Sequence, residues 1–150
     1  MERMRRLTPN VSVASQIDED DVARLAALGF RTIVNNRPDG ESPEQPPAVA
    51  IRAAAARHGL GYVDVPVVSG AITEADVATA RRVLGEAEGP VLMFCRSGNR
   101  STALWALTEA HHLDPDTLIA TGWDAGFNLG PLRATLARRW RDPAQGVDGR

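Results

Sequence analysis

The feature that most constrains the fold is the stretch 91–107, VLMFCRSGNRSTALWAL, in which a short apolar run passes through a glycine-containing loop into a helical pattern. Val91–Phe94 follows Gly89-Pro90 and predicts a buried strand. A helix is expected from about Arg100 to His112. Strands that lead into helices are the units of parallel sheets, because the next parallel strand is reached through a crossover. The stretch therefore favours an α/β fold.

The rest of the chain repeats this alternation of strands and helices. Further strands are predicted at Asn10–Ala14, Arg31–Asn35 and Tyr62–Val68, and further helices at Asp18–Leu28, Ala48–His58, Thr73–Ala87, Pro115–Thr121 and Leu132–Trp140. The pattern predicts a three-layer α/β architecture, with a mainly parallel central sheet and helices on both faces. Open sheets of this kind bind ligands at the carboxyl ends of their strands, where the loop after Phe94 lies.

Length and composition narrow the class of protein. The 150 residues are expected to form a single domain, 1–150, with a frayed tail over about 142–150. The net charge of −2 argues against nucleic acid and against an anionic membrane surface as partners. No apolar run is long enough to span a membrane, and a lone cysteine cannot form an internal disulfide, so a cytoplasmic location is expected. No pattern in the sequence indicates an oligomeric state.

The loop Cys95–Ser101 combines a thiol, a glycine and an arginine at the predicted ligand-binding edge. Backbone N–H groups of a loop that passes through Gly98 can point inward, and so form an anion-binding nest above a helix N-terminus. This setting and the charge of Arg100 favour a thiolate at Cys95. Cys95 and Arg100 are therefore the predicted catalytic residues, unless Cys95 is only a small buried hydrophobe. The predicted anion-binding loop comprises Arg96, Ser97, Gly98, Asn99 and Ser101.

A second loop, 36–47, is rich in proline and acidic residues and is long enough to suggest a function. Arg37 directly follows a predicted strand, so it either binds an anion near Cys95 or is an ordinary surface arginine. Asp39 or Glu41 would supply a carboxylate if the loop folds over the site, although Pro38-Asp39-Gly40 is also ordinary turn chemistry. No group of residues has metal-ligand spacing, so neither a metal nor a cofactor is expected.

The sequence CRSGNRS resembles the active-site loop of rhodaneses, whose cysteine carries a persulfide. It also resembles the loop of cysteine-dependent phosphatases, in which five residues separate the cysteine from the arginine. Here only four residues separate Cys95 from Arg100, which is the rhodanese length, and Phe94 stands where the phosphatase motif has histidine.

The rest of the chain resembles a phosphatase family instead. SQIDEDDVARLAALGFRTIVNNRPDGE, YVDVPVVSGAIT and CRSGNRS together resemble the bacterial β-lactamase hydrolase-like, phosphatase-like domain family over about residues 7–112. The resemblance implies a cysteine-phosphatase-like α/β fold of the dual-specificity type, here with a loop of rhodanese length.

The two resemblances predict different reactions on a small anionic substrate. Phosphatases of this type protonate the leaving alcohol from a loop that corresponds to Val67–Ile72, which has no carboxylate. General acid catalysis raises reaction rates about 10²–10⁴-fold, so a site without a general acid would hydrolyse phosphate monoesters more slowly. Sulfite leaves thiosulfate without a proton. We therefore expect a rhodanese-type sulfurtransferase, in which Cys95 passes a persulfide sulfur to an acceptor thiol or cyanide. The alternatives are a phosphatase with a phosphocysteine intermediate, and a non-catalytic persulfide carrier or sulfide-responsive regulator.

Overall fold

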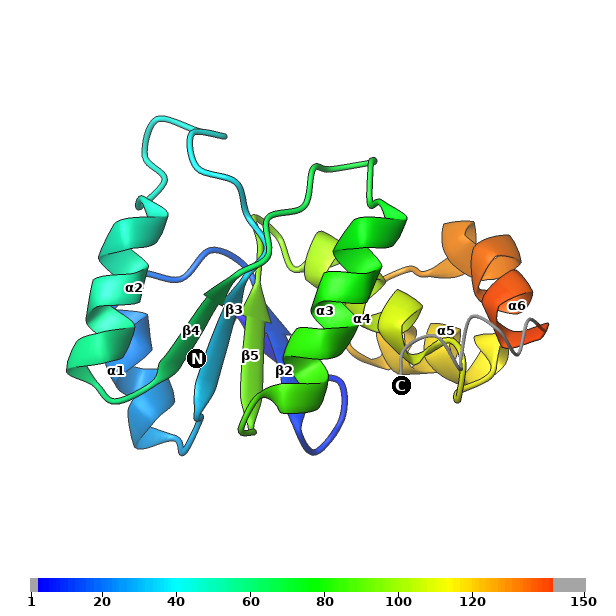
Figure 1. Ribbon diagram of the computed structural model, residues 1–150, viewed down its shortest axis with the longest axis horizontal. Helices are drawn as coiled ribbons and strands as arrows, with labels where there is room; N and C mark the ends of the chain where they lie inside the picture. The colour runs from blue at the N-terminus through cyan, green and yellow to red at the C-terminus, as the bar shows by residue number, and fades with distance from the viewer. Residues whose placement is uncertain (1–2, 142–150) are drawn as a thin grey trace.

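The computed structural model describes residues 3–141, which form a central sheet covered by helices on both faces (Figure 1). The sheet has the strand order β1-β2-β5-β3-β4. Its strands are β1 Met4–Arg6, β2 Val11–Ala14, β3 Thr32–Asn35, β4 Gly61–Asp64 and β5 Val91–Phe94. Strand β1 pairs antiparallel with β2, and all other pairings are parallel. The predicted three-layer α/β architecture with a mainly parallel sheet is confirmed.

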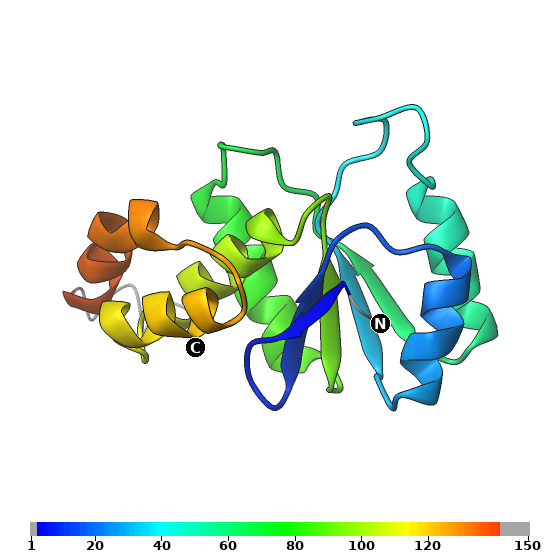
Figure 2. The same ribbon diagram turned by 180° about the vertical axis from the view of Figure 1, so that it is seen from behind.

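The helices divide between the two faces of the sheet. One face carries α1 Glu19–Ala27 and α2 Ala48–Arg57 (Figure 1). The other side of the molecule carries α3 Glu74–Glu86, α4 Asn99–Glu109, α5 Pro115–Asp124, the 3₁₀ turn η1 Gly130–Leu132 and α6 Arg133–Arg141. Helices α3 and α4 cover the sheet on this side, and α5 and α6 lie farther from it, as the view from behind also shows (Figure 2).

Side-chain alternation along the strands builds two hydrophobic cores. Val91 and Met93 of β5 pack into the core beneath α3 and α4, whereas Leu92 and Phe94 pack into the core beneath α1 and α2. Because successive strand residues point to opposite faces, the middle strand must be apolar throughout. This requirement explains why β5 is a continuous apolar run and why its bounds agree with the prediction.

Local capping fixes where two helices begin. The Asp18 carboxylate accepts a hydrogen bond from the Asp21 N–H (2.8 Å), and the Asp21 carboxylate accepts one from the Asp18 N–H (3.0 Å). Thr73 and Asp76 form the same reciprocal pair at the start of α3. Each capping box satisfies two backbone donors that the helix itself leaves unpaired.

The structure adds one strand to the prediction and changes the bounds of two predicted elements. Strand β1 was not predicted, because its three residues are two arginines and a methionine with no apolar alternation. The strand predicted at Tyr62–Val68 ends at Asp64, before Pro66, which cannot donate to a ladder. Helix α5 continues to Asp124, beyond the predicted end at Thr121. The predicted frayed tail, 142–150, lies outside the described residues.

The topology brings three connecting segments to one edge of the sheet. The carboxyl ends of β3, β4 and β5 lie side by side, and segments 36–47, 65–73 and 95–98 leave from them (upper edge of Figures 1 and 2). Among residues 3–141 no helix is both long and apolar enough to cross a membrane.

Candidate active site

Cys95 follows the middle strand of the sheet and is completely buried. Its N–H donates to the carbonyl of Ala14 at the end of β2 (3.3 Å). The carbonyl of Phe94, the preceding residue, accepts a hydrogen bond from the Asn36 N–H after β3 (2.8 Å). Both neighbouring strands therefore hold the backbone at Cys95.

The loop after Cys95 turns back so that its backbone faces the sulfur. Gly98 has φ +96°, in the left-handed region, and its N–H donates to Cys95 Sγ (3.1 Å). A side chain at Gly98 would be strained, and its Cβ would lie 2.8 Å from the Phe127 ring. Gly98 also precedes α4, so the sulfur lies at a helix N-terminus. A donor to sulfur and a helix N-terminus both stabilise a thiolate.

Arg100 points from the first turn of α4 toward the other two segments and is 9% exposed. Its Nη1 donates to the Val67 carbonyl (2.8 Å) and to Glu41 Oε2 (2.8 Å), and its Nη2 donates to Glu41 Oε1 (2.7 Å). The hydrogen bonds from Arg100 to Glu41 raise the pKa of Arg100, and the charge of the neighbouring Cys95 raises it further. The guanidinium is therefore held by hydrogen bonds from its two terminal nitrogens, and it lies beside the sulfur.

The contacts with Glu41 leave one edge of the Arg100 guanidinium available to bind an anion. A guanidinium can bind a carboxylate or phosphate through its two terminal nitrogens or through Nε together with one of them. Glu41 occupies the terminal pair, and within the described residues Nε of Arg100 donates to no oxygen. The Nε–Nη2 edge is thus the part of Arg100 that can receive an oxyanion.

Glu41 is held by a second arginine. Arg37 Nε donates to Glu41 Oε1 (3.0 Å), and the other Arg37 nitrogens donate to Gln16 (3.0 Å) and Ser42 (3.2 Å). Arg37 is 5% exposed, so it is not an ordinary surface arginine. The hydrogen bond from Arg100, and to a smaller extent that from Arg37, lowers the pKa of Glu41 below 4.5. Glu41 is therefore ionised at neutral pH.

Asn36 joins segment 65–73 to the first turn of α4 and was not predicted as a site residue. Its side chain donates to the Val65 carbonyl (2.9 Å) and accepts from the Ser101 hydroxyl (2.8 Å), and it is completely buried. Ser101, predicted to belong to the anion-binding loop, is turned toward Asn36 instead. The signal in the sequence was a polar residue directly after a strand rich in β-branched residues. A polar side chain that is buried at such a position needs a hydrogen-bond partner.

The other predicted residues lie around the mouth of the loop. Arg96, Ser97 and Asn99 are exposed, and the Ser97 hydroxyl accepts from the Asn99 N–H (3.2 Å). Asp39 is turned away from the site, because its carboxylate accepts from the Ala48 N–H at the start of α2 (2.8 Å). Of the two carboxylates in segment 36–47 considered from the sequence, the structure thus brings Glu41 and not Asp39 to Arg100. Residues 3–141 contain no cluster of three or more potential metal ligands among His, Cys, Asp and Glu.

Sequence comparison places this site among phosphatase-like proteins. The family described as β-lactamase hydrolase-like protein, phosphatase-like domain, matches residues 3–112. A β-lactamase hydrolase-like protein of Xylella fastidiosa is 39% identical over 139 residues, which are 91% of this chain and 32% of the relative. The chain thus spans about a third of the length of that relative. The dual specificity protein phosphatase TpbA of Pseudomonas aeruginosa is 27% identical over 121 residues, which are 79% of this chain and 48% of TpbA.

Solved structures agree with this placement. A candidate phosphatase of Neisseria meningitidis superposes with a TM-score of 0.81 at 34% identity, covering 90% of this chain and 96% of the other. TpbA in complex with phosphotyrosine superposes with a TM-score of 0.62 at 22% identity, covering 90% of each chain, and this likeness concerns the fold. The predicted cysteine-phosphatase-like fold is confirmed.

Proposed function

The chain belongs to the β-lactamase hydrolase-like protein, phosphatase-like domain family, and from this membership we propose that it is a cysteine-dependent phosphatase acting on phosphate monoesters. The observation that carries the proposal is the buried Cys95 sulfur, which faces the Gly98 N–H and lies beside the guanidinium of Arg100. The comparisons favour this reaction over the sulfur transfer that the length of the loop and the lack of a carboxylate in Val67–Ile72 predict.

In the proposed first step the Cys95 thiolate attacks the phosphorus of the monoester. An S–P bond forms while the ester P–O bond breaks, and the alcohol oxygen leaves with the bonding electron pair. The loop N–H groups and the Nε–Nη2 edge of Arg100 bind the non-bridging phosphoryl oxygens. Because these donors are fixed by the fold before the substrate arrives, they stabilise charge in the transition state without reorganising.

In the second step water attacks the phosphocysteine, the S–P bond breaks, and inorganic phosphate and the thiolate are released. Glu41 is a positioning residue in this scheme: as an ionised carboxylate bound to two arginines it orients Arg100, and it has no proton to give in the resting protein. Segment 65–73 carries no carboxylate either. The proposal therefore includes a preference for leaving groups that depart without strong protonation, such as phenols, over alkyl alcohols.

One assay separates the candidate reactions. The protein is supplied in parallel with 4-nitrophenyl phosphate and with thiosulfate plus cyanide, and its mass is measured after each incubation. The proposal requires release of phosphate and a phosphocysteine adduct in acid-quenched samples, both absent from Cys95→Ser. One added sulfur on Cys95 after thiosulfate, with thiocyanate turnover and no release of phosphate, would establish sulfur transfer instead. A stable added sulfur without turnover would indicate a persulfide carrier.

A further inference from the structure

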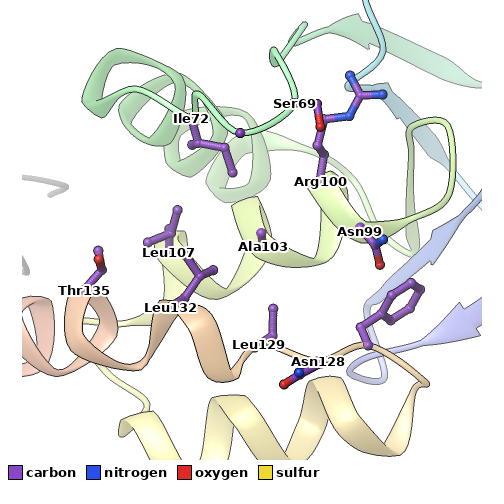
Figure 3. Close-up of a pocket in the computed structure, with 12 residues that line it drawn as sticks. Ser69, Ile72, Asn99, Arg100, Ala103, Leu107, Asn128, Leu129, Leu132 and Thr135 are labelled. Carbon is purple, nitrogen blue, oxygen red and sulfur yellow. The ribbon is translucent and has the colours of Figure 1, made fainter.

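A cavity of about 560 Å³ runs along the outer side of α4, beginning at the catalytic loop (Figure 3). Its floor is one face of the helix, formed by Asn99, Ala103 and Leu107. These residues are four apart, so they lie in a row roughly 12 Å long at 1.5 Å per residue. The volume lies within the range of about 300–1,000 Å³ that is typical of small-molecule sites.

The walls of the cavity are mainly apolar, although Ser69, Asn128 and Thr135 also line it. Ile72 contributes from segment 65–73, and Phe127, Leu129 and Leu132 contribute from the connection between α5 and α6. Among the described residues that line the cavity, Arg100 is the one charged residue, and in Figure 3 its guanidinium points away from the apolar side chains. A ligand group bound here would therefore be uncharged and largely apolar, since a buried charge without a partner is strongly unfavourable.

The cavity is continuous with the catalytic loop. Asn99 and Arg100 belong to the loop and also line the end of the cavity nearest to it, together with Ser69. Phe127 lies against Gly98, the residue whose N–H faces the sulfur, and also forms part of the cavity wall. A phosphoryl group held by the loop would thus have this cavity directly beside it.

We propose that the cavity binds the alcohol portion of the substrate, and that the substrate is the phosphate ester of a bulky, uncharged aryl alcohol. This inference rests on the proposed function and specifies its substrate class. Two independent features lead to it: the apolar lining selects an uncharged aromatic body, and the lack of a carboxylate in segment 65–73 favours a phenolic leaving group.

The test compares phenyl phosphate with 4-biphenylyl phosphate, whose second ring would enter the cavity. The wild type should show a kcat/KM at least tenfold higher for the biphenylyl ester, because burial of a phenyl-sized group corresponds to roughly a tenfold gain or more. Ala103→Phe fills the floor of the cavity and should abolish this ratio while leaving inhibition by vanadate unchanged. Leu132→Asn, which keeps the side-chain size but makes the wall polar, should reduce the ratio as well.

A matched control and a binding measurement make the outcomes distinguishable. Val49→Phe adds similar aromatic bulk at a 68% exposed position on α2, on the other face of the sheet, and should leave the ratio unchanged. If both esters are hydrolysed with a ratio that neither Ala103→Phe nor Leu132→Asn alters, the cavity assignment is wrong and the proposed function stands. If neither ester is hydrolysed but calorimetry shows 4-phenylphenol binding that Ala103→Phe removes, the cavity assignment stands and the proposed function is wrong.

Discussion

Segments 36–47 and 65–73 leave neighbouring parallel strands at the same edge of the sheet and meet the same arginine, but they do so with different chemistry. Segment 36–47 contains one arginine and three acidic residues and contacts Arg100 through the Glu41 carboxylate. Segment 65–73 contains no charged residue and contacts Arg100 through the Val67 carbonyl. Segment 36–47 therefore contributes charged groups to the site, whereas segment 65–73 contributes only uncharged ones.

Under the proposed function, this difference assigns a different task to each segment. Segment 36–47 orients the anion-binding arginine, because a carboxylate matches the planar fork of the guanidinium. Segment 65–73 supplies a backbone acceptor for that arginine and, through Ser69 and Ile72, one wall of the apolar cavity. Glu41 is ionised at neutral pH and segment 65–73 has no carboxylate, so under the proposed function the cavity selects the leaving group.

The largest expected effect follows from changing the residue on which both segments converge. Arg100→Lys should lower kcat/KM for 4-nitrophenyl phosphate by about 100-fold or more, because an ammonium cannot bind Glu41 and an oxyanion through two separate edges. Steady-state kinetics measures the loss, and circular dichroism checks that the fold is kept. Full turnover in a folded Arg100→Lys protein would mean that Arg100 only begins the helix.

Removing the charged contact should have a smaller effect than removing the arginine. Glu41→Gln retains one acceptor but loses the charge, so we expect about a tenfold lower kcat/KM through a less well oriented guanidinium. Glu44→Gln is the matched control: it makes the same change in the same segment at an exposed carboxylate that the structure does not bond to Arg100. Equal losses in the two variants would show that net charge, and not orientation, matters.

The same ion pair should make the stability of the protein depend on pH. Contacts with Arg100 and Arg37 lower the pKa of Glu41 from 4.5, so the folded state favours the ionised carboxylate. The stabilisation is therefore present above pH 4.5 and is lost as the pH falls through the lowered pKa. Relative to Glu41→Gln, the wild type should be about 1 kcal/mol more stable at neutral pH. Urea unfolding at several pH values should show this difference shrinking in acid; a constant difference would contradict it.

A substitution in segment 65–73 should increase kcat for one class of substrate by a few-fold. Ser69→Asp places a carboxylic acid in segment 65–73, beside the catalytic end of the cavity. It should raise kcat for an alkyl phosphate several-fold below neutral pH, where part of the carboxyl is protonated, and should change 4-nitrophenyl phosphate hydrolysis little. Ser69→Asn provides the control for shape without acidity. An equal gain in both variants would mean that the acid is not what the segment lacks.

Features encoded by neighbouring residues were predictable from the sequence. Strand β5 was placed at its observed bounds, because a middle strand is apolar throughout and Gly89-Pro90 marks its start. The helix predicted from Thr73 is α3, and its start is encoded locally because Asp76, the capping partner of Thr73, is only three residues away. Cys95, Gly98 and Arg100 lie within six consecutive residues, so they could be read together as one loop.

Contacts between distant residues were not predictable. Glu41 and Arg100 are 59 residues apart, and Asn36 and Ser101 are 65 apart, so their pairing depends on how three segments fold over one edge. The cavity depends in the same way on the connection between α5 and α6. The length of the loop favoured sulfur transfer, but it is a property of only the six residues around the sulfur. The similarity to the phosphatase-like domain family extends over residues 3–112.

The smallest effect is expected at Asp39, two residues from Glu41 and in the same charged segment. Its carboxylate accepts a hydrogen bond from the Ala48 N–H (2.8 Å), while Pro47 at the N-cap provides no side-chain cap for α2. Asp39→Asn keeps an acceptor oxygen and should change kcat/KM less than twofold. Asp39→Ala removes the acceptor and should lower the free energy of unfolding by about 1 kcal/mol, again with little change in turnover. Thermal or urea unfolding and steady-state kinetics on both variants separate the two roles.

A large loss of turnover in Asp39→Asn, with stability intact, would instead make Asp39 a general acid that swings into the site when substrate binds. Segment 36–47 would then contribute a proton as well as an oriented arginine, and the division of tasks between the two segments would be wrong.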